Sequence, residues 1–369
     1  MKRILIFCLL ILSVLGLCSC SKDKYEPVPS TDEEARTVLT LSVNGKKYEV
    51  RYELYKALFI GNREDVDGGD SSVWFGDGKN EYIEKINEII INRASDIYSV
   101  FHFADKLGIN LYSSEIDEKV KEAIKIAVEG DGQNITGHGS YENYLSHLKD
   151  QGMNYSVGDL LLRYSIGLSK INEYYVGEDD VLGEKDGALK YTDEDLRAFY
   201  DGDESARIIK AYFQKGVKSE SEMQSFINRL KEQNLLIDKA LYIIQSTLAT
   251  SSEIIGQNNK VSGVIIGKYA LDDAFYSEYT EAAFALSDGE VSSLIEIKGV
   301  GDNYSDGYYV LVGVDKDDEY FANHKDEIEI AYVDNYIGKL LEEAKQALIP
   351  SAQFSNNYTT DIVTNLINN

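Results

Sequence analysis

Apolar residues recur every three to four positions through most of the first half of the chain, which is the spacing of amphipathic helices. The clearest pattern runs from Glu81 to Leu107 and ends at Gly108. Further helices are predicted at 51–60, 114–128, 141–149, 156–171 and 192–200. A hairpin with a type I′ turn at Asn44 and Gly45 is predicted ahead of them, and the Gly- and Asp-rich stretch 62–79 is predicted to be a loop. The region 38–200 is therefore predicted to be mainly helical.

Several of the predicted helices begin at a polar residue that suits an N-cap. Ser114, Ser156, Thr192 and Ser219 are each followed three residues later by Asp or Glu, which is the pattern of a capping box. In a capping box the two side chains satisfy backbone N–H groups that the first helical turn leaves unpaired. These four residues are therefore predicted to mark where helices begin.

The pattern changes after Asp201. Residues 206–214, ARIIKAYFQ, form an apolar run of strand length. Helices at 220–233 and 237–248 are predicted to follow, then a strand at 263–269, a helix at 279–286, and strands at 291–297 and 308–314. A last helix, 325–348, is predicted to end before Pro350. This mixture of helices and strands predicts an α+β protein.

The first 20 residues have the features of a secretion signal. A basic start at residues 2–3 precedes an apolar core at 4–17 that is too short for a comfortable membrane span. The ending LCSC is similar to a bacterial lipoprotein box, which predicts lipidation of Cys20 because the small Ser19 precedes it. A plain signal peptide and an uncleaved anchor are the alternatives. We expect a lipoprotein signal peptide at 1–19 and a flexible tether at 20–37.

Charge and composition exclude several functions. The chain has 369 residues, enough for two or three domains, and a formal net charge of −26. A surface this acidic repels phosphate backbones, so nucleic acid is not expected as a partner. The three cysteines, Cys8, Cys18 and Cys20, all lie in the N-terminal segment, so the mature part can form no internal disulfide and has no thiol nucleophile. No metal-site, phosphate-loop or catalytic-serine motif occurs, and we expect no metal and no cofactor.

Phrases in both halves of the chain resemble extracytoplasmic folding factors of the PrsA and SurA kind. GVIIGKY, then YTEAAFALSDGEVSSLIEI, then GYYVLVGVDK resembles the second half of a parvulin-type peptidyl-prolyl isomerase domain. The hairpin, the long helix, the Leu-Gly-Ile break at 107–109 and the phrase YTDEDLRAFY resemble the N-terminal chaperone region. The resemblance implies a helical SurA-like chaperone region at 38–200 and a parvulin-like domain at 201–316, with a small antiparallel sheet and flanking helices. It also implies a C-terminal helix within 317–369 that packs on the N-terminal region.

The resemblance also implies an isomerase site with two histidines beside an apolar proline pocket. Phe213 and Tyr309 stand where it places the histidines. The histidines of the chain are His102, His138, His147 and His324. None of them lies in 201–316, so no alternative alignment restores the histidine pair. The candidates for the pocket are Phe213, Phe275, Tyr279, Phe284 and Tyr309, with plain core packing as the alternative reading of each.

These observations predict a lipid-anchored extracytoplasmic chaperone or foldase that assists the folding of secreted proteins. It is expected to be attached to a bacterial membrane through Cys20 and to bind unfolded or partly folded secreted polypeptides. The parvulin-like domain is predicted to have weak or no catalytic activity. Two alternatives stay open: an active peptidyl-prolyl isomerase, and a solute-binding or surface-adhesion lipoprotein.

Overall fold

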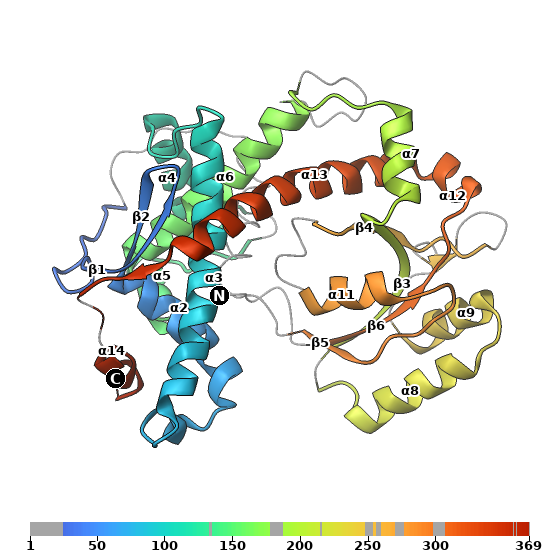
Figure 1. Ribbon diagram of the computed structural model, residues 1–369, viewed down its shortest axis with the longest axis horizontal. Helices are drawn as coiled ribbons and strands as arrows, with labels where there is room; N and C mark the ends of the chain where they lie inside the picture. The colour runs from blue at the N-terminus through green and yellow to red at the C-terminus, as the bar shows by residue number, and fades with distance from the viewer. Residues whose placement is uncertain are drawn as a thin grey trace. The chain divides into compact units, whose positions relative to one another are not determined.

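The computed structural model describes residues 25–132, 135–177, 187–214, 216–247, 254–255, 260–269, 277–297, 307–356, 358 and 360–368. The chain divides into two compact units: unit 1 comprises Met1–Ile171 and Leu341–Asn369, and unit 2 comprises Asn172–Leu340. Helices and small antiparallel sheets occur in both units (Figure 1), so the predicted α+β class is confirmed. No helix within these described ranges is long and apolar enough to cross a membrane.

Unit 1 combines a small sheet with long helices. Its elements are β1 (Thr37–Val43), β2 (Lys46–Arg51), α2 (Tyr52–Asp67), η1 (Ser71–Trp74), α3 (Lys79–Lys106), α4 (Ser114–Glu129), α5 (Tyr141–Asp150), η4 (Ile349–Ser351), β7 (Gln353–Phe354) and α14 (Thr360–Asn368). Two helices, α6 (Tyr155–Val176) and α13 (Lys325–Leu348), belong partly to unit 1 and partly to unit 2. The sheet is antiparallel with the order β2-β1-β7, so β2 is an edge strand.

The predicted hairpin is confirmed. Asn44 and Gly45 have φ values of 50° and 81°, the positive values that a two-residue type I′ turn requires. Along β2, Tyr48 and Val50 are buried while the residues between and beside them are exposed. This alternation gives β2 one face toward the core of unit 1 and one face toward solvent.

The predicted long helix is confirmed as α3, but the predicted loop at 62–79 is wrong at its start, because α2 continues to Asp67. Polar side chains hold this extension. The Asn62 side chain donates a hydrogen bond to the Leu58 carbonyl at 2.6 Å, and Trp74 Nε1 donates to Asp67 Oδ2 at 2.7 Å. Trp74 itself is fully buried. The segment shows little apolar periodicity because polar groups make several of its buried contacts.

Two of the four predicted N-caps are confirmed. Thr192 before α7 (Asp193–Asp201) and Ser219 before α8 (Glu220–Glu232) form complete capping boxes. The other two predictions are wrong by one or two residues: the side chain of Ser113 caps α4, and Asn154 Oδ1 accepts a backbone hydrogen bond at the start of α6. The predicted helices still form, since their apolar faces decide that, but backbone conformation decides which side chain reaches the first turn.

Unit 2 contains a four-stranded antiparallel sheet. Its elements are α7, β3 (Ser205–Gln214), α8, α9 (Leu236–Ser246), β4 (Val264–Gly267), α11 (Ser277–Ala285), β5 (Ile295–Ile297), β6 (Gly307–Gly313), α12 (Asp318–Asn323) and most of α13. The strand order is β4-β3-β6-β5. The predicted strand at 291–297 is shorter than expected, because Val291 makes only an isolated bridge to Val312. The small antiparallel sheet with flanking helices is confirmed.

Helices cover both faces of this sheet, α8 and α9 on one side and α11 on the other (Figure 1). Ile209, Ala211 and Phe213 of β3 point into the core that includes the apolar residues of α8 and α9. Ile208 points to the opposite face and packs with Ala283 of α11. The alternation of side chains along β3 therefore separates two apolar clusters.

Candidate functional site

Three of the five predicted pocket residues meet on the α11 face of the unit 2 sheet. Tyr279 and Phe284 lie on α11, Tyr309 lies on β6, and all three are partly buried against the cluster beneath α11. The ring centroid of Tyr309 is 5.2 Å from that of Tyr279 and 5.3 Å from that of Tyr212, which is 37% exposed. We call the surface formed by Tyr212, Tyr279, Phe284 and Tyr309 the tyrosine face.

Phe213 does not belong to the tyrosine face, contrary to its prediction as a pocket residue. It follows Tyr212 on β3, and successive residues of a strand point to opposite faces of the sheet. Phe213 is only 4% exposed, and its ring packs edge-on against Phe226 with centroids 4.9 Å apart. It is a core residue. Two other predicted residues, Phe275 and the lipidation site Cys20, lie outside the described residues.

The tyrosine face offers contact area rather than acid–base chemistry. Residues 201–316 contain no histidine and no cysteine, the side chains whose ordinary pKa values lie nearest to neutrality. Within the part of the chain that the structure describes, no group of three or more His, Cys, Asp or Glu residues could hold a metal ion. Tyrosine hydroxyls ordinarily ionise near pH 10 and can donate and accept hydrogen bonds at neutral pH. The face is suited to holding an apolar segment by ring contact.

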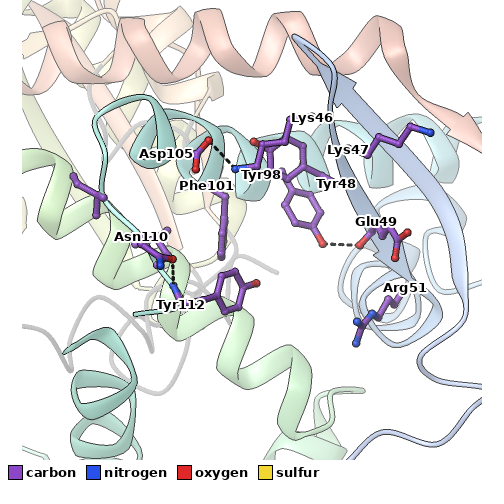
Figure 2. A pocket seen from close by; sticks show the side chains of 12 residues that line it. Lys46, Lys47, Tyr48, Glu49, Arg51, Tyr98, Phe101, Asp105, Asn110 and Tyr112 are labelled. Carbon is purple, nitrogen blue, oxygen red and sulfur yellow. Dashed lines mark hydrogen bonds and ion pairs between the residues drawn. The ribbon is translucent and has the colours of Figure 1, made fainter. Parts of the chain in front are cut away.

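A second candidate site lies in unit 1, where a pocket of about 390 Å³ opens beside the edge strand β2 (Figure 2). Its walls come from β2, from the end of α3, and from the connection between α3 and α4. The residues that line it are Lys46, Lys47, Tyr48, Glu49, Arg51, Tyr98, Phe101, Asp105, Ile109, Asn110, Leu111 and Tyr112. We call it the β2 pocket. Its volume lies within the range of about 300–1,000 Å³ that is usual for ligand sites.

Four aromatic side chains form a continuous row in the β2 pocket. Ring centroids are 5.2 Å apart for Tyr48 and Tyr98, 5.9 Å for Tyr98 and Phe101, and 6.0 Å for Phe101 and Tyr112. The i, i+3 spacing on α3 places Tyr98 and Phe101 on one side of that helix. The first three rings are largely buried, whereas Tyr112 is 62% exposed. The row therefore runs from the core to an open aromatic surface.

Arg163 of α6 fixes the exposed end of this row. Its guanidinium carbon lies 4.8 Å from the centroid of the Tyr112 ring, a cation–π distance. Its nitrogens donate hydrogen bonds to the Leu111 carbonyl at 2.7 Å and to carboxylate oxygens of Asp117 and Asp159 at 2.8 Å each. Burial alone would lower the pKa of Arg163, but the hydrogen bonds and charges of Asp159 and Asp117 outweigh it and raise the pKa. Arg163 thus stays charged and holds Tyr112 in place.

The charge of the β2 pocket differs from that of the protein as a whole. Among its lining residues, the cations Lys46, Lys47 and Arg51 outnumber the carboxylates Glu49 and Asp105, although the chain carries a net charge of −26. Lys46 is paired with Asp105 at 2.8 Å. Lys47 takes part in no ion pair among the described residues. The pocket therefore favours an occupant that is apolar and carries negative charge at its edge.

His102 lies beneath the aromatic row. Its Nδ1 is 3.1 Å from the Tyr48 hydroxyl. Burial, followed by the charges of Lys106 and Lys46, lowers the pKa of His102 below its ordinary value of 6.5. The imidazole is therefore neutral at pH 7, and its Nδ1 can accept the hydrogen bond from Tyr48.

The sequence patterns did not reveal the β2 pocket. Its residues come from three separate segments, 46–51, 98–105 and 109–112, and the first two read as an ordinary strand and an ordinary amphipathic helix. The one local signal is Tyr112, a large aromatic residue in the break between two helices. Single exposed aromatic residues are common on protein surfaces. Tyr112 therefore indicates a binding site only because the structure shows that it lines the pocket.

No protein-family model and no curated protein matches this sequence. Three solved structures of foldase protein PrsA are similar to the chain at low identity. The protein from Streptococcus pneumoniae str. Canada MDR_19A gives a TM-score of 0.30 at 14% identity, covering 73% of this chain and 89% of that one. The protein from Lactococcus lactis gives 0.24 at 12% identity, covering 90% and 99%, and the protein from Bacillus subtilis gives 0.23 at 17% identity, covering 78% and 93%. At TM-scores this low, the likeness establishes neither the arrangement nor the function of this chain.

Proposed function

We propose that this protein is a chaperone of the foldase kind, which holds unfolded or partly folded secreted polypeptides outside the cytoplasm. The observation that carries the proposal is the aromatic row of the β2 pocket, which ends at the 62%-exposed ring of Tyr112 beside an edge strand. Aromatic side chains provide a large contact area at low entropic cost, which suits binding to many different apolar segments. The tyrosine face of unit 2 offers a second surface of the same chemical kind.

We further propose that unit 2, with its parvulin-like strand and helix order, has little or no isomerase activity. Rotation about a peptide bond must cross a barrier of about 18–20 kcal/mol, and the isomerase site implied by the resemblance uses a polar cluster containing histidines. Tyr309 stands at one of the two implied histidine positions, and no histidine occurs in 201–316. The tyrosine face can bind a proline-containing segment without supplying that cluster.

The chaperone function is tested by light scattering during the aggregation of a reduced, unfolded secreted protein, with the mature chain added. Wild type is expected to slow aggregation, and Tyr112→Ser is expected to weaken this effect severalfold. Tyr174→Ser is a matched control, since Tyr174 is also an exposed tyrosine, 45% exposed, and does not line the β2 pocket. A wild-type protein that leaves aggregation unchanged would overturn the proposal and favour a solute-binding or surface-adhesion lipoprotein.

The isomerase activity is tested separately with a proline-containing peptide and the same mature chain. We expect the uncatalysed rate. A rate enhancement that is lost in Tyr279→Ala would show that the protein is an active isomerase and that the tyrosine face is its catalytic surface. Tyr174→Ala serves as the control for a general effect of removing a tyrosine.

The lipid anchor is proposed at Cys20, at the end of the predicted signal segment. Attachment through a lipid predicts that the wild-type protein sediments with membranes after cell breakage and that detergent releases it. The variant Cys20→Ser is expected in the soluble fraction or as an uncleaved precursor. If Cys20→Ser is cleaved and sediments like wild type, the lipid anchor is excluded.

A further inference from the structure

The free edge of β2 presents backbone hydrogen-bonding groups to the β2 pocket. In an antiparallel hairpin with a two-residue turn, the residues that flank the turn form a hydrogen-bonded pair, and such pairs then alternate with non-bonded ones. The flanking pair here is Val43 with Lys46, so Tyr48 also bonds toward β1. Lys47 and Glu49 therefore direct their N–H and C=O groups away from β1, toward the open edge.

One hydrogen bond shows this direction in the structure. The Tyr98 hydroxyl donates to the Glu49 carbonyl at 2.7 Å, from the side of the pocket (Figure 2). This hydroxyl occupies the place that the N–H of an added strand would take. Within the described part of the chain, no hydrogen bond outside the β1–β2 ladder reaches the backbone of Lys47. The edge is thus open at Lys47 and covered at Glu49 by the Tyr98 hydroxyl.

The two faces of β2 differ in chemistry, and an added strand would extend both. Tyr48 is buried on the face that carries the aromatic row, whereas Lys47, Glu49 and Arg51 are exposed on the other face, where two cations flank one carboxylate. Alternate residues of an added strand would meet these two faces in turn. One set of side chains would enter the β2 pocket, and the other set would lie on a face where the cations Lys47 and Arg51 outnumber the carboxylate Glu49.

We propose that an extended segment of a client polypeptide binds antiparallel to β2 as a fourth strand of this sheet, with apolar side chains in the β2 pocket and acidic side chains beside Lys47 and Arg51. The proposal rests on the proposed function, because it specifies how the protein holds a client. An edge lysine discourages pairing with neutral or basic strands. The same lysine therefore selects acidic, alternating segments over other extended ones.

Strand addition to β2 is tested with a fluorescein-labelled synthetic peptide in which phenylalanine and aspartate alternate. A residue paired with Lys47 shares its exposed face and exchanges both backbone hydrogen bonds with it. The aspartates, not the phenylalanines, therefore direct their N–H groups at β2. N-methylation of the aspartates is expected to abolish binding to the full mature chain in fluorescence anisotropy, whereas N-methylation of the phenylalanines leaves it intact. Equal affinity of the two methylated peptides would overturn strand addition.

Variants of the mature chain test the same geometry from the protein side. Tyr98→Phe keeps the ring but frees the Glu49 carbonyl, so the unmethylated peptide is expected to bind about two- to tenfold more tightly, the worth of one hydrogen bond. Tyr174→Phe is the control and should bind like wild type. Lys47→Glu should weaken binding of this peptide but not of one in which serine replaces aspartate. Unchanged or weaker binding by a folded Tyr98→Phe variant would count against the proposal.

The aggregation and peptide-binding experiments together distinguish a failure of strand addition from a failure of the proposed chaperone function. If the wild-type protein slows client aggregation while both methylated peptides bind equally, the protein is a chaperone that holds its clients through side chains alone. If it neither slows aggregation nor binds the unmethylated peptide, the proposed function fails as well.

Discussion

Replacing Phe213 by alanine is expected to destabilise unit 2 without removing a client-binding group. Phe213 is 4% exposed, and large-to-small core substitutions of this kind cost about 3–5 kcal/mol. Its edge-on contact with Phe226 and the Lys218 ammonium group 4.9 Å from its ring place the loss toward the upper part of that range, at about 4 kcal/mol. Tyr212→Ala, one residue earlier and on the opposite face, is expected to cost only about 1 kcal/mol.

Urea unfolding of the full chain measures this difference. Trp74 is the only tryptophan in the sequence and lies in unit 1, so its fluorescence identifies the unfolding of unit 1. Far-ultraviolet circular dichroism records both units, and the transition of unit 2 follows by comparison. A loss of about 4 kcal/mol lowers the urea midpoint of unit 2 by about 2 M. A Phe213→Ala variant that loses under about 1 kcal/mol but binds clients poorly would refute the assignment of Phe213 to the core.

Three further predictions concern stability and the β2 pocket. Burial, followed by the charges of Lys106 and Lys46, lowers the pKa of His102 in the folded state below 6.5. As the pH falls, His102 is therefore protonated first in the unfolded chain. Unit 1 is expected to keep its full stability above pH 6.5 and to lose part of it as the pH falls below 6.5 toward the folded-state pKa. Urea unfolding followed by tryptophan fluorescence at pH 7.5 and 5.5 checks this, and an unchanged pH dependence in His102→Gln would contradict it. Thr192→Ala removes the capping box of α7 and is expected to lower the free energy of unfolding of unit 2 by about 1 kcal/mol, as measured by urea unfolding. An unchanged free energy of unfolding would show that the cap does not stabilise unit 2. Arg163→Met leaves the Leu111 carbonyl and the carboxylates of Asp117 and Asp159 without their donor. Because these carboxylate side chains are 45% and 23% exposed and water can reach them, the expected cost to unit 1 is about 1–3 kcal/mol. A folded variant with unchanged peptide affinity would show that Arg163 does not position the pocket.

Sequence reasoning succeeded where the controlling interactions are local. The Asn44-Gly45 turn and the capping boxes at Thr192 and Ser219 depend on residues at most three positions apart, and the structure contains all of them. The long helix α3 was also predictable, because its apolar stripe repeats over many turns. The extension of α2 was missed because Asp67 is held by a hydrogen bond from Trp74 rather than by apolar periodicity.

The candidate site was less predictable, because a surface is made by residues that are distant in sequence. Alternation along a strand implies that neighbours such as Tyr212 and Phe213 point in opposite directions. Only the pairing of β3 between β4 and β6, with helices on both faces, decided which of the two is buried. Tyr279 and Tyr309 were predicted as members of one pocket, and the structure brings their rings to 5.2 Å. The sequence showed which residues are aromatic, but it did not show which face of the sheet each of them occupies.

The sequence by itself determined the α+β class, most of the helices and strands, and the absence of histidine and cysteine from 201–316, because periodicity, turn chemistry and composition are properties of short segments. Only the tertiary structure decided that Tyr48, Tyr98, Phe101 and Tyr112 form one row beside an open strand edge. The physical reason is that strand pairing and helix packing bring together residues up to 64 positions apart, and no local pattern records which strand is left with an unpaired edge.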